Sequence, residues 1–152
     1  QQLEKIVKRT GGKMKNLLLE VPESALGKDI EGVIRRLRML KQKGVKLALD
    51  HFGTGSSSLR MLRHFPVDLI KIDSSFVSDV LHDENDAAVT AAILALAHQL
   101  ELKVLAEGVA TARHVQFLER YWCDCLQGDY YCKDVSMAQI RSFLEQYLSQ
   151  YG

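Results

Sequence analysis

Five short apolar segments recur along the chain, and each one ends on a polar or charged residue. The segments cover residues 17–20, 47–50, 69–73, 104–107 and 123–127, and they end on Glu20, Asp50, Asp73, Glu107 and Gln127. Near-continuous apolar runs of this length are typical of strands in a parallel sheet that is covered on both faces. The pattern therefore predicts five buried parallel strands.

Helical patterns lie between these segments. In residues 30–40 the apolar side chains recur at the spacing of one helix face, and Gly44 follows as a stop signal. A second helix is expected from about Asn85, which would cap it, to Leu100. Further helices fit residues 57–64, 112–121 and 136–147, and the chain opens on a helix-like segment. This alternation indicates an α/β fold with a parallel sheet, either open or closed into a barrel.

Length and composition limit the alternatives. The chain has 152 residues, 47% of them hydrophobic, with 20 Lys and Arg against 19 Asp and Glu. This balance indicates one folded domain and argues against binding of a nucleic-acid polymer through bulk charge. No apolar run approaches the roughly 18 residues that span a bilayer, so no membrane contact and a cytoplasmic location are expected. A complete eightfold barrel takes about 250 residues, so the sheet is either small and open or part of a larger barrel.

The three cysteines predict no metal site and no disulfide framework. Cys123, Cys125 and Cys132 form an odd set, which suits a reduced cytoplasmic chain. Their spacing fits no metal motif, and alternate residues of a strand point to opposite faces. We expect them to act as small buried side chains.

The polar strand ends predict a functional site, because the carboxyl ends of parallel strands meet at one edge of a sheet. Several carboxylates beside Lys71 would repel one another unless a cation lay among them. Hard oxygen ligands suit Mg²⁺ or Mn²⁺, and paired metal ions promote phosphodiester hydrolysis. Lys71 would then position the attacking water or offset phosphate charge. The alternative is that each carboxylate caps the next helix or pairs with a nearby Lys or Arg.

A glycine-rich turn at residues 50–58 follows the second predicted strand and leads into a helix. Its backbone N–H groups could face an anion, as at other helix N-termini. It matches neither a dinucleotide-binding fingerprint nor a P-loop, because Ser58 replaces the third glycine and no Gly-Lys-Ser/Thr follows. The turn alone identifies no ligand.

In order and spacing, the motifs together resemble the EAL domain, the family of cyclic di-GMP phosphodiesterases. The resemblance covers about residues 3–145 and rests on Leu-Glu-Val-Pro-Glu-Ser at 19–24, Leu-Ala-Leu-Asp-His-Phe-Gly-Thr-Gly at 47–55, Pro-Val-Asp-Leu-Ile-Lys-Ile-Asp at 66–73, Ala-Glu-Gly-Val at 106–109 and Gln-Gly at 127–128. It implies a TIM-like barrel that hydrolyses cyclic di-GMP to linear pGpG with two Mg²⁺ or Mn²⁺ ions.

The resemblance also implies roles for individual residues. Glu107 and Lys71 would be catalytic, with Glu107 a metal ligand or general base and Lys71 holding the attacking water. The implied metal ligands are Glu20, Asp50, Asp73 and Glu107, with His51 at a position where the family has a second aspartate. Gln127 would contact the substrate. Glu23 would anchor the loop that contains Gly53, Thr54 and Gly55, which in the family links the site to dimerisation.

Departures from the family pattern are equally specific. His51 is a poor ligand for Mg²⁺, and Ala110 stands where a glutamate is usual. Asp129 and Asp134 replace an expected aromatic residue and a proline. The Glu-Ala-Leu motif itself and an asparagine ligand would precede residue 1. We therefore expect residues 1–152 to be a single incomplete EAL domain, a partial TIM-like barrel that lacks its N-terminal strands.

Two functional hypotheses remain open at this point. In the first, the intact parent protein is a cyclic di-GMP phosphodiesterase in bacterial signalling, in a family whose members carry sensory or GGDEF domains and can carry a membrane tether, and this segment alone has weak or no activity. In the second, a degenerate EAL domain binds the nucleotide or a protein without hydrolysis. An incomplete barrel would expose a strand edge and apolar surface, so a homodimer or other self-association is expected.

Overall fold

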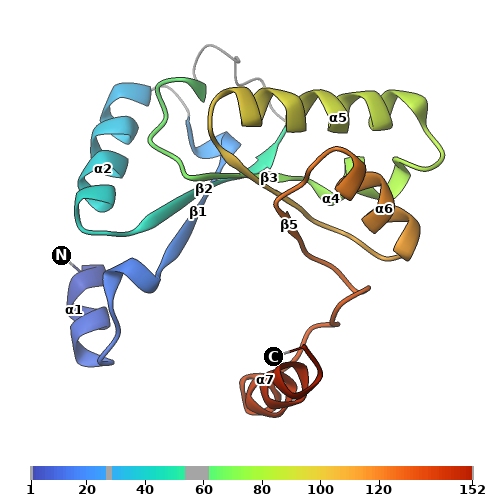
Figure 1. Cartoon of the computed structure of the whole chain (residues 1–152). Coiled ribbons are helices and arrows are strands. Elements are labelled where there is room, and N and C mark those ends of the chain that lie inside the picture. The colour runs from blue at the N-terminus through green and yellow to red at the C-terminus, as the bar shows by residue number, and fades with distance from the viewer. Residues whose placement is uncertain (1, 27–28, 54–61, 152) are drawn as a thin grey trace.

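One parallel sheet organises the structure, a computed structural model that describes residues 2–26, 29–53 and 62–151. Its strands run in the order β1-β2-β3-β4-β5, and every neighbouring pair is parallel (Figure 1). The strands are β1 (Leu18–Pro22), β2 (Lys46–Phe52), β3 (Leu69–Ile72), β4 (Lys103–Ala106) and β5 (Cys125–Leu126). The prediction of five parallel strands alternating with helices is confirmed.

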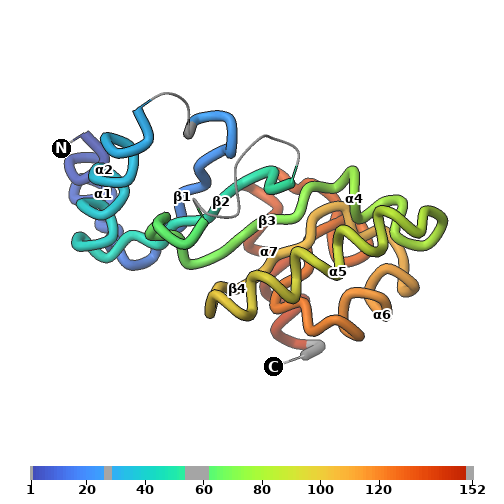
Figure 2. The backbone as a smooth tube through the Cα atoms, turned by 90° about the horizontal axis from the view of Figure 1, so that it is seen from above, coloured from blue at the N-terminus to red at the C-terminus, as the bar shows by residue number. Residues whose placement is uncertain are grey.

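Helices connect and flank the strands. They are α1 (Gln2–Arg9), α2 (Ile30–Gln42), α4 (Ser74–Asp79), α5 (Glu84–Gln99), α6 (Ala112–Arg120) and α7 (Met137–Tyr151), with short 3₁₀ helices at Met14–Asn16 and Glu23–Leu26. In Figure 1, α2 and α5 lie above the sheet and α7 lies below it, at the end of an extended stretch. In the view from above in Figure 2, α1 and α2 both lie at one end of the molecule and α6 lies at the other, while Figure 1 shows α1 well below α2.

The strand order distinguishes between two kinds of parallel sheet. Doubly wound open sheets reverse their strand order at a switch point, whereas the strands of a (βα) barrel follow one another in sequence. Here the spatial order equals the chain order throughout. The fold is therefore of the barrel type.

The core lies between one face of the sheet and the helices. Leu47, Leu49, Ile70, Ile72 and Val104 are almost fully buried there. Because side chains alternate along a strand, the residues between them point to the opposite face. Lys71 lies between Ile70 and Ile72, and Asp50 follows Leu49, so these two polar side chains are directed away from the helix-packed core.

Two strand ends differ from the prediction. Glu20 lies in the middle of β1, which continues to Pro22, and Asp50 lies inside β2, which continues to Phe52. β2 continues because an extra residue is accommodated as a bulge between Leu49 and Phe52. Asp73, Glu107 and Gln127 do follow their strands directly.

Helix boundaries agree in most places with the sequence pattern, but the proposed cap of α5 was wrong. The N-cap is Asp83, two residues before Asn85, and its carboxylate accepts hydrogen bonds from the backbone N–H groups of Asn85 and Asp86. The expected helix at 57–64 falls largely on residues 54–61, outside the described part of the chain. The pattern gave no sign of the short α4.

Helix α7 presents an exposed apolar row. Met137, Ile140, Leu144, Tyr147 and Leu148 recur at helical spacing, and their exposed fractions range from 40% to 85%. A row of this kind on a surface helix normally packs against another element.

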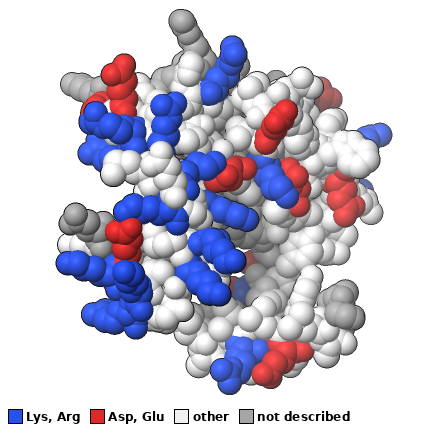
Figure 3. Space-filling view, turned by 60° about the vertical axis from the view of Figure 1, so that its left-hand side comes forward, with Lys and Arg blue, Asp and Glu red and all other residues white. Residues whose placement is uncertain are grey.

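Charge is distributed unevenly over the surface. More than half of the Lys and Arg residues lie within the first 46 residues, and Figure 3 shows basic side chains gathered on one side of the molecule. Lys5, Lys8 and Arg9 of α1 belong to this basic part of the chain and are exposed to solvent. Among the described residues, no helix has the length and apolar character needed to span a membrane.

Two aspartates hold pairs of neighbouring strands together at their amino-terminal ends. The carboxylate of Asp68, just before β3, accepts hydrogen bonds from the Leu47 N–H of β2 at 2.9 Å and from Lys41 Nζ at 2.8 Å. Asp124, just before β5, accepts from the Val104 N–H of β4 at 2.9 Å and lies 3.4 Å from His98 Nε2. We call these two arrangements the aspartate bridges.

We expect Asp68→Ala to lower the free energy of unfolding by about 1–3 kcal/mol, because it leaves the buried Leu47 amide without its acceptor. Chemical denaturation of both proteins measures this change. Asp134→Ala, at an exposed position outside the aspartate bridges, serves as the control and should stay within about 0.5 kcal/mol of the wild type. Equal stability of the Asp68→Ala variant and the wild type would contradict the role given to the bridge.

Candidate functional site

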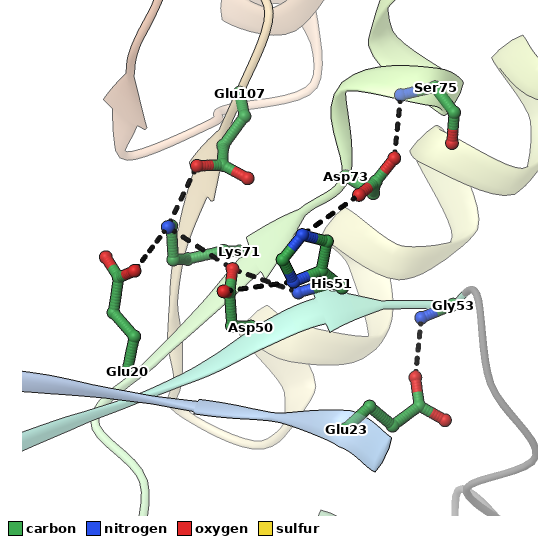
Figure 4. A network of polar contacts seen from close by, with 9 residues as sticks. All are labelled: Glu20, Glu23, Asp50, His51, Gly53, Lys71, Asp73, Ser75 and Glu107. Atoms are coloured by element: carbon green, nitrogen blue, oxygen red, sulfur yellow. Dashed lines mark hydrogen bonds and ion pairs between the residues drawn. The ribbon is translucent and has the colours of Figure 1, made fainter. Parts of the chain in front are cut away.

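The ammonium group of Lys71 is the centre of the candidate site. Its Nζ lies 2.8 Å from Glu107, 2.9 Å from Glu20 and 3.2 Å from Asp50 (Figure 4). The Lys71 side chain is only 5% exposed, and the three carboxylates come from β1, β2 and the end of β4. A buried positive charge of this kind requires negatively charged partners, and here the three carboxylates are those partners.

The surroundings of Lys71 fix its charge. Burial by itself would lower the pKa of Lys71, but the hydrogen bonds to Glu107, Glu20 and Asp50 outweigh it and hold the pKa well above its ordinary value. Because the shift is upward, the stabilisation is complete below the ordinary lysine pKa and is lost only at strongly alkaline pH. The group is therefore a fixed positive charge at any physiological pH.

The bulge in β2 brings two consecutive side chains to this site. Asp50 and His51 together occupy the place opposite Lys71, and His51 adopts a left-handed backbone conformation with φ +54°. The His51 ring lies between two carboxylates, with Nδ1 3.0 Å from Asp50 and Nε2 3.7 Å from Asp73. A histidine at φ above zero is uncommon, and such positions concentrate at functional sites.

Asp73 has a different position from the other predicted ligands. Its carboxylate caps α4 by accepting a hydrogen bond from the Ser75 N–H at 2.8 Å, and hydrogen bonds to Ser75 together with nearby His51 lower its pKa. This is the helix-capping role that the sequence left open as an alternative. Among the described residues, His51 links Asp73 to Asp50 and so to the Lys71 group. The predicted part of Asp73 in metal binding stays a prediction.

A pocket of about 400 Å³ opens beside Glu107. It is lined by Ser74, Glu107, Gly108, Ala110, Gln127, Gly128 and Asp129. Gln127, predicted to contact substrate, therefore lies in the same pocket as a predicted catalytic residue. Ser74 and Gly108 were not predicted as site residues, although Gly108 stands in the Ala-Glu-Gly-Val motif and a glycine directly after a strand end is a usable signal. Gly108 has φ +76°, and a Cβ added there would lie 2.7 Å from the Cβ of Ser74.

The predicted loop anchor contacts its loop. Glu23 accepts a hydrogen bond from the Gly53 N–H at 3.1 Å, across 30 positions of sequence, and is buried. Gly53 has φ +96°, a conformation that glycine adopts without strain. Thr54 and Gly55, the other predicted loop residues, lie outside the described residues.

The carboxylate groups of the site suit a hard divalent cation as ligands, but in this structure they are not arranged around a metal position. Glu20, Asp50 and Glu107 offer carboxylate oxygens, which Mg²⁺ and Mn²⁺ prefer. In the described part of the chain, no group of three or more His, Cys, Asp or Glu side chains is placed to hold a metal ion. The carboxylates converge on Lys71 instead.

The cysteines are free thiols in the structure. Burial raises the pKa of the Cys123 thiol to about 11, as expected for an inert, partly buried side chain. Cys125 is exposed at the sheet edge, contrary to the expectation that all three are buried. The reason is that β5 is the last strand in the sheet.

Comparisons with known proteins agree on one family. A family model described as EAL domain matches residues 1–134. The chain is 41% identical over 131 residues to the cyclic di-GMP phosphodiesterase NbdA of Pseudomonas aeruginosa, covering 86% of this chain and 17% of that protein. It is 43% identical over 113 residues to the bifunctional diguanylate cyclase/cyclic di-GMP phosphodiesterase MucR of the same organism, covering 74% of this chain and 16% of MucR.

Solved structures show the same similarity. The MucR phosphodiesterase in complex with cyclic di-GMP aligns with a TM-score of 0.86 at 37% identity, over 90% of this chain and 56% of that one. BlrP1 of Klebsiella pneumoniae, in a complex with manganese and cyclic di-GMP, aligns with a TM-score of 0.78 at 29% identity, over 86% of this chain and 33% of that one. The chain thus spans about one sixth of the curated relatives and about half of the MucR structure.

Removal of the central cation tests the site. In Lys71→Met we expect the free energy of unfolding at pH 8 to fall by about 3 kcal/mol, because three carboxylates are left facing one another. The loss should be smaller at pH 4.5, where these carboxylates can take up protons. Denaturation at both pH values measures it, with Lys103→Met, at an exposed position of β4, as the matched control. A loss independent of pH would mean that packing of the Lys71 stem, and not its charge, matters.

Proposed function

The chain belongs to the EAL domain family, and from this premise we propose that it contributes the greater part of a metal-dependent site that hydrolyses cyclic di-GMP to linear pGpG. The observation that carries the proposal is the convergence of Glu20, Asp50 and Glu107 on Lys71, next to the pocket that contains Gln127. Relatives named as cyclic di-GMP phosphodiesterases support the same substrate and reaction.

The proposed roles follow from position. Glu20, Asp50 and Glu107 would hold divalent metal, with Asp73 and His51 next to them, and Mg²⁺ or Mn²⁺ is the candidate. When bound, such ions polarise a phosphoryl oxygen and activate water. Glu107 lines the pocket and would act on the attacking water as a base. Lys71 would orient Glu107 and offset the negative charge of the phosphodiester, and Gln127 would contact the nucleotide across the pocket.

A second candidate function is nucleotide binding without hydrolysis. The observation that favours it is that Lys71 already occupies the space among the carboxylates, while no three-ligand group exists in the described residues. His51 and Ala110, at positions where the family has acidic residues, favour it too. We therefore propose that the chain by itself turns over cyclic di-GMP weakly or not at all.

Isothermal titration of cyclic di-GMP in Ca²⁺, followed by product analysis in Mn²⁺, separates the candidates. It should be run on the chain and on the gene product that contains it. Binding with formation of pGpG supports the phosphodiesterase, and binding without product supports the receptor. Absence of binding in both proteins would refute both.

The same carboxylates make specific variants informative. In the gene product that contains the chain, Glu107→Gln should lower kcat at least about 100-fold while cyclic di-GMP binding in Ca²⁺ is partly retained, because the amide cannot act as a base. Glu119→Gln, at an exposed position of α6 outside the pocket lining, is the control and should keep most of the activity. Equal loss of binding and turnover in Glu107→Gln would assign Glu107 a structural role.

His51→Asp restores the family residue at the bulge. We expect it to raise Mg²⁺-dependent hydrolysis by about tenfold, because a carboxylate is a better Mg²⁺ ligand than imidazole. Initial rates in Mg²⁺ and in Mn²⁺ measure the effect, and the gain should be larger in Mg²⁺. An unchanged rate in both metals would show that His51 does not limit the reaction.

We also propose self-association through α7, supported by its exposed apolar row, and partner domains such as a GGDEF cyclase in the gene product. The bifunctional name of MucR supports the second of these. Neither affects the assignment of the residues around Lys71.

A further inference from the structure

Backbone hydrogen bonds join the segment Glu107–Ala110 to other parts of the chain. This segment follows β4 and begins with Glu107, a predicted catalytic residue. The Glu107 N–H donates to the Ile72 carbonyl at 3.1 Å, and the Val109 N–H donates to the Gln127 carbonyl at 3.0 Å. The Val109 carbonyl accepts from the Tyr130 N–H at 3.0 Å. The two chain segments that line the pocket, Glu107–Ala110 and Gln127–Asp129, are thereby connected by backbone hydrogen bonds.

The last amide of this segment is held by a side chain. The Ala110 N–H donates to Nδ1 of His114, a residue of α6, at 3.2 Å. The His114 side chain is buried, although histidine is a residue that usually keeps contact with solvent. None of the sequence motifs quoted above includes His114.

The contact is a variant of a known helix-capping arrangement. Thr111 is the N-cap of α6, and its Oγ1 accepts a hydrogen bond from the His114 N–H at 3.3 Å. In the usual capping box, a Glu or Gln three residues after the cap accepts from the backbone N–H of the cap residue itself. Here the third residue is His114, and it accepts from Ala110, one residue earlier. The capping contact therefore reaches into the segment that begins with Glu107.

The hydrogen bond fixes the state of the ring. An amide N–H can donate only to an unprotonated nitrogen, so Nδ1 carries no proton and the neutral ring has its proton on Nε2. Burial lowers the pKa of His114, and nearby His82 lowers it further, so that the ring is neutral around pH 7.

We propose that His114 is a positioning residue for Glu107. By holding the Ala110 amide, its Nδ1 fixes the segment Glu107–Ala110 between α6 and β5, and this keeps the Glu107 carboxylate on Lys71 at the edge of the pocket. The consequence for catalysis rests on the proposed function, whereas the positioning itself does not. A purely local helix cap would stabilise α6 and leave Glu107 where it is.

Two variants of His114 separate these roles. Asn places an amide oxygen close to the position of Nδ1 and can accept the same hydrogen bond, and Leu fills the space without an acceptor. In His114→Leu we expect the Ala110 amide and the Lys71 ammonium protons to exchange with solvent at least about tenfold faster, as measured by NMR on the chain. His114→Asn should restore both. In the wild type, a scalar coupling between the Ala110 nitrogen and His114 Nδ1 should be visible.

The outcomes decide the proposal whether or not the chain is an enzyme. Faster exchange at Ala110 with unchanged Lys71 ammonium exchange in His114→Leu would overturn it, since the residue would then be only a helix cap. If His114→Leu does not fold, two other results would overturn the proposal. One is a proton on Nδ1 of His114 in the wild type. The other is exchange of the Ala110 amide and Lys71 ammonium protons in His114→Asn that is faster than in the wild type. In an active gene product, His114→Leu should lower kcat about tenfold with little change in KM. If the wild type lacks activity while the exchange results hold, the proposed function fails alone.

Discussion

A buried ammonium group surrounded by carboxylates is the constraint on which the rest of this structure depends. Lys71 is buried in β3, a strand of four buried residues. Asp50 of β2 and Glu107, which follows β4, contact it from the two neighbouring strands, and Glu20 contacts it from β1, one strand beyond β2. Separating Lys71 from these carboxylates would leave its buried ammonium charge without compensation. The strands can therefore shift relative to one another only a little, and the polar site and the sheet stabilise each other.

Much of this could be predicted from the chain because the determining patterns are local. Apolar runs identify buried strands, and the motifs around Asp50, Lys71 and Glu107 identify the family. The bulge at Asp50 and His51 could not be predicted in this way, because it depends on how β2 pairs with β3 and not on either sequence alone. The helix cap at Asp83 was missed because Asn85 is also a good capping residue, and only the observed hydrogen bonds distinguish the two positions.

The site also contains contacts that join distant parts of the chain. Glu23 with Gly53, and Val109 with Gln127, are pairs that no local pattern connects. Gly128 is a third case, since a Cβ there would lie 2.3 Å from the carbonyl oxygen of Val109. The backbones of the two loops pass too close for any other residue to fit without movement. A family resemblance can point to such positions, but the reason for them becomes visible only in three dimensions.

The two aspartate bridges have nearly the same spacing along the chain. In each, a basic residue on a helix (Lys41 or His98) is followed by a backbone amide at the start of a strand (Leu47 or Val104). The aspartate (Asp68 or Asp124) then stands just before the next strand. They lie at the opposite ends of the strands from Lys71. Each bridge accepts the hydrogen bond of a single backbone amide, so it permits one alignment of its strand pair and excludes a slip by one residue. The bridges at the amino-terminal ends of the strands therefore also determine how the strands are aligned at the end that carries Lys71. The Lys71 cluster thus joins strands whose pairing the bridges also fix, so a change at one side chain of this end, such as His51, leaves the second set of constraints on the sheet in place.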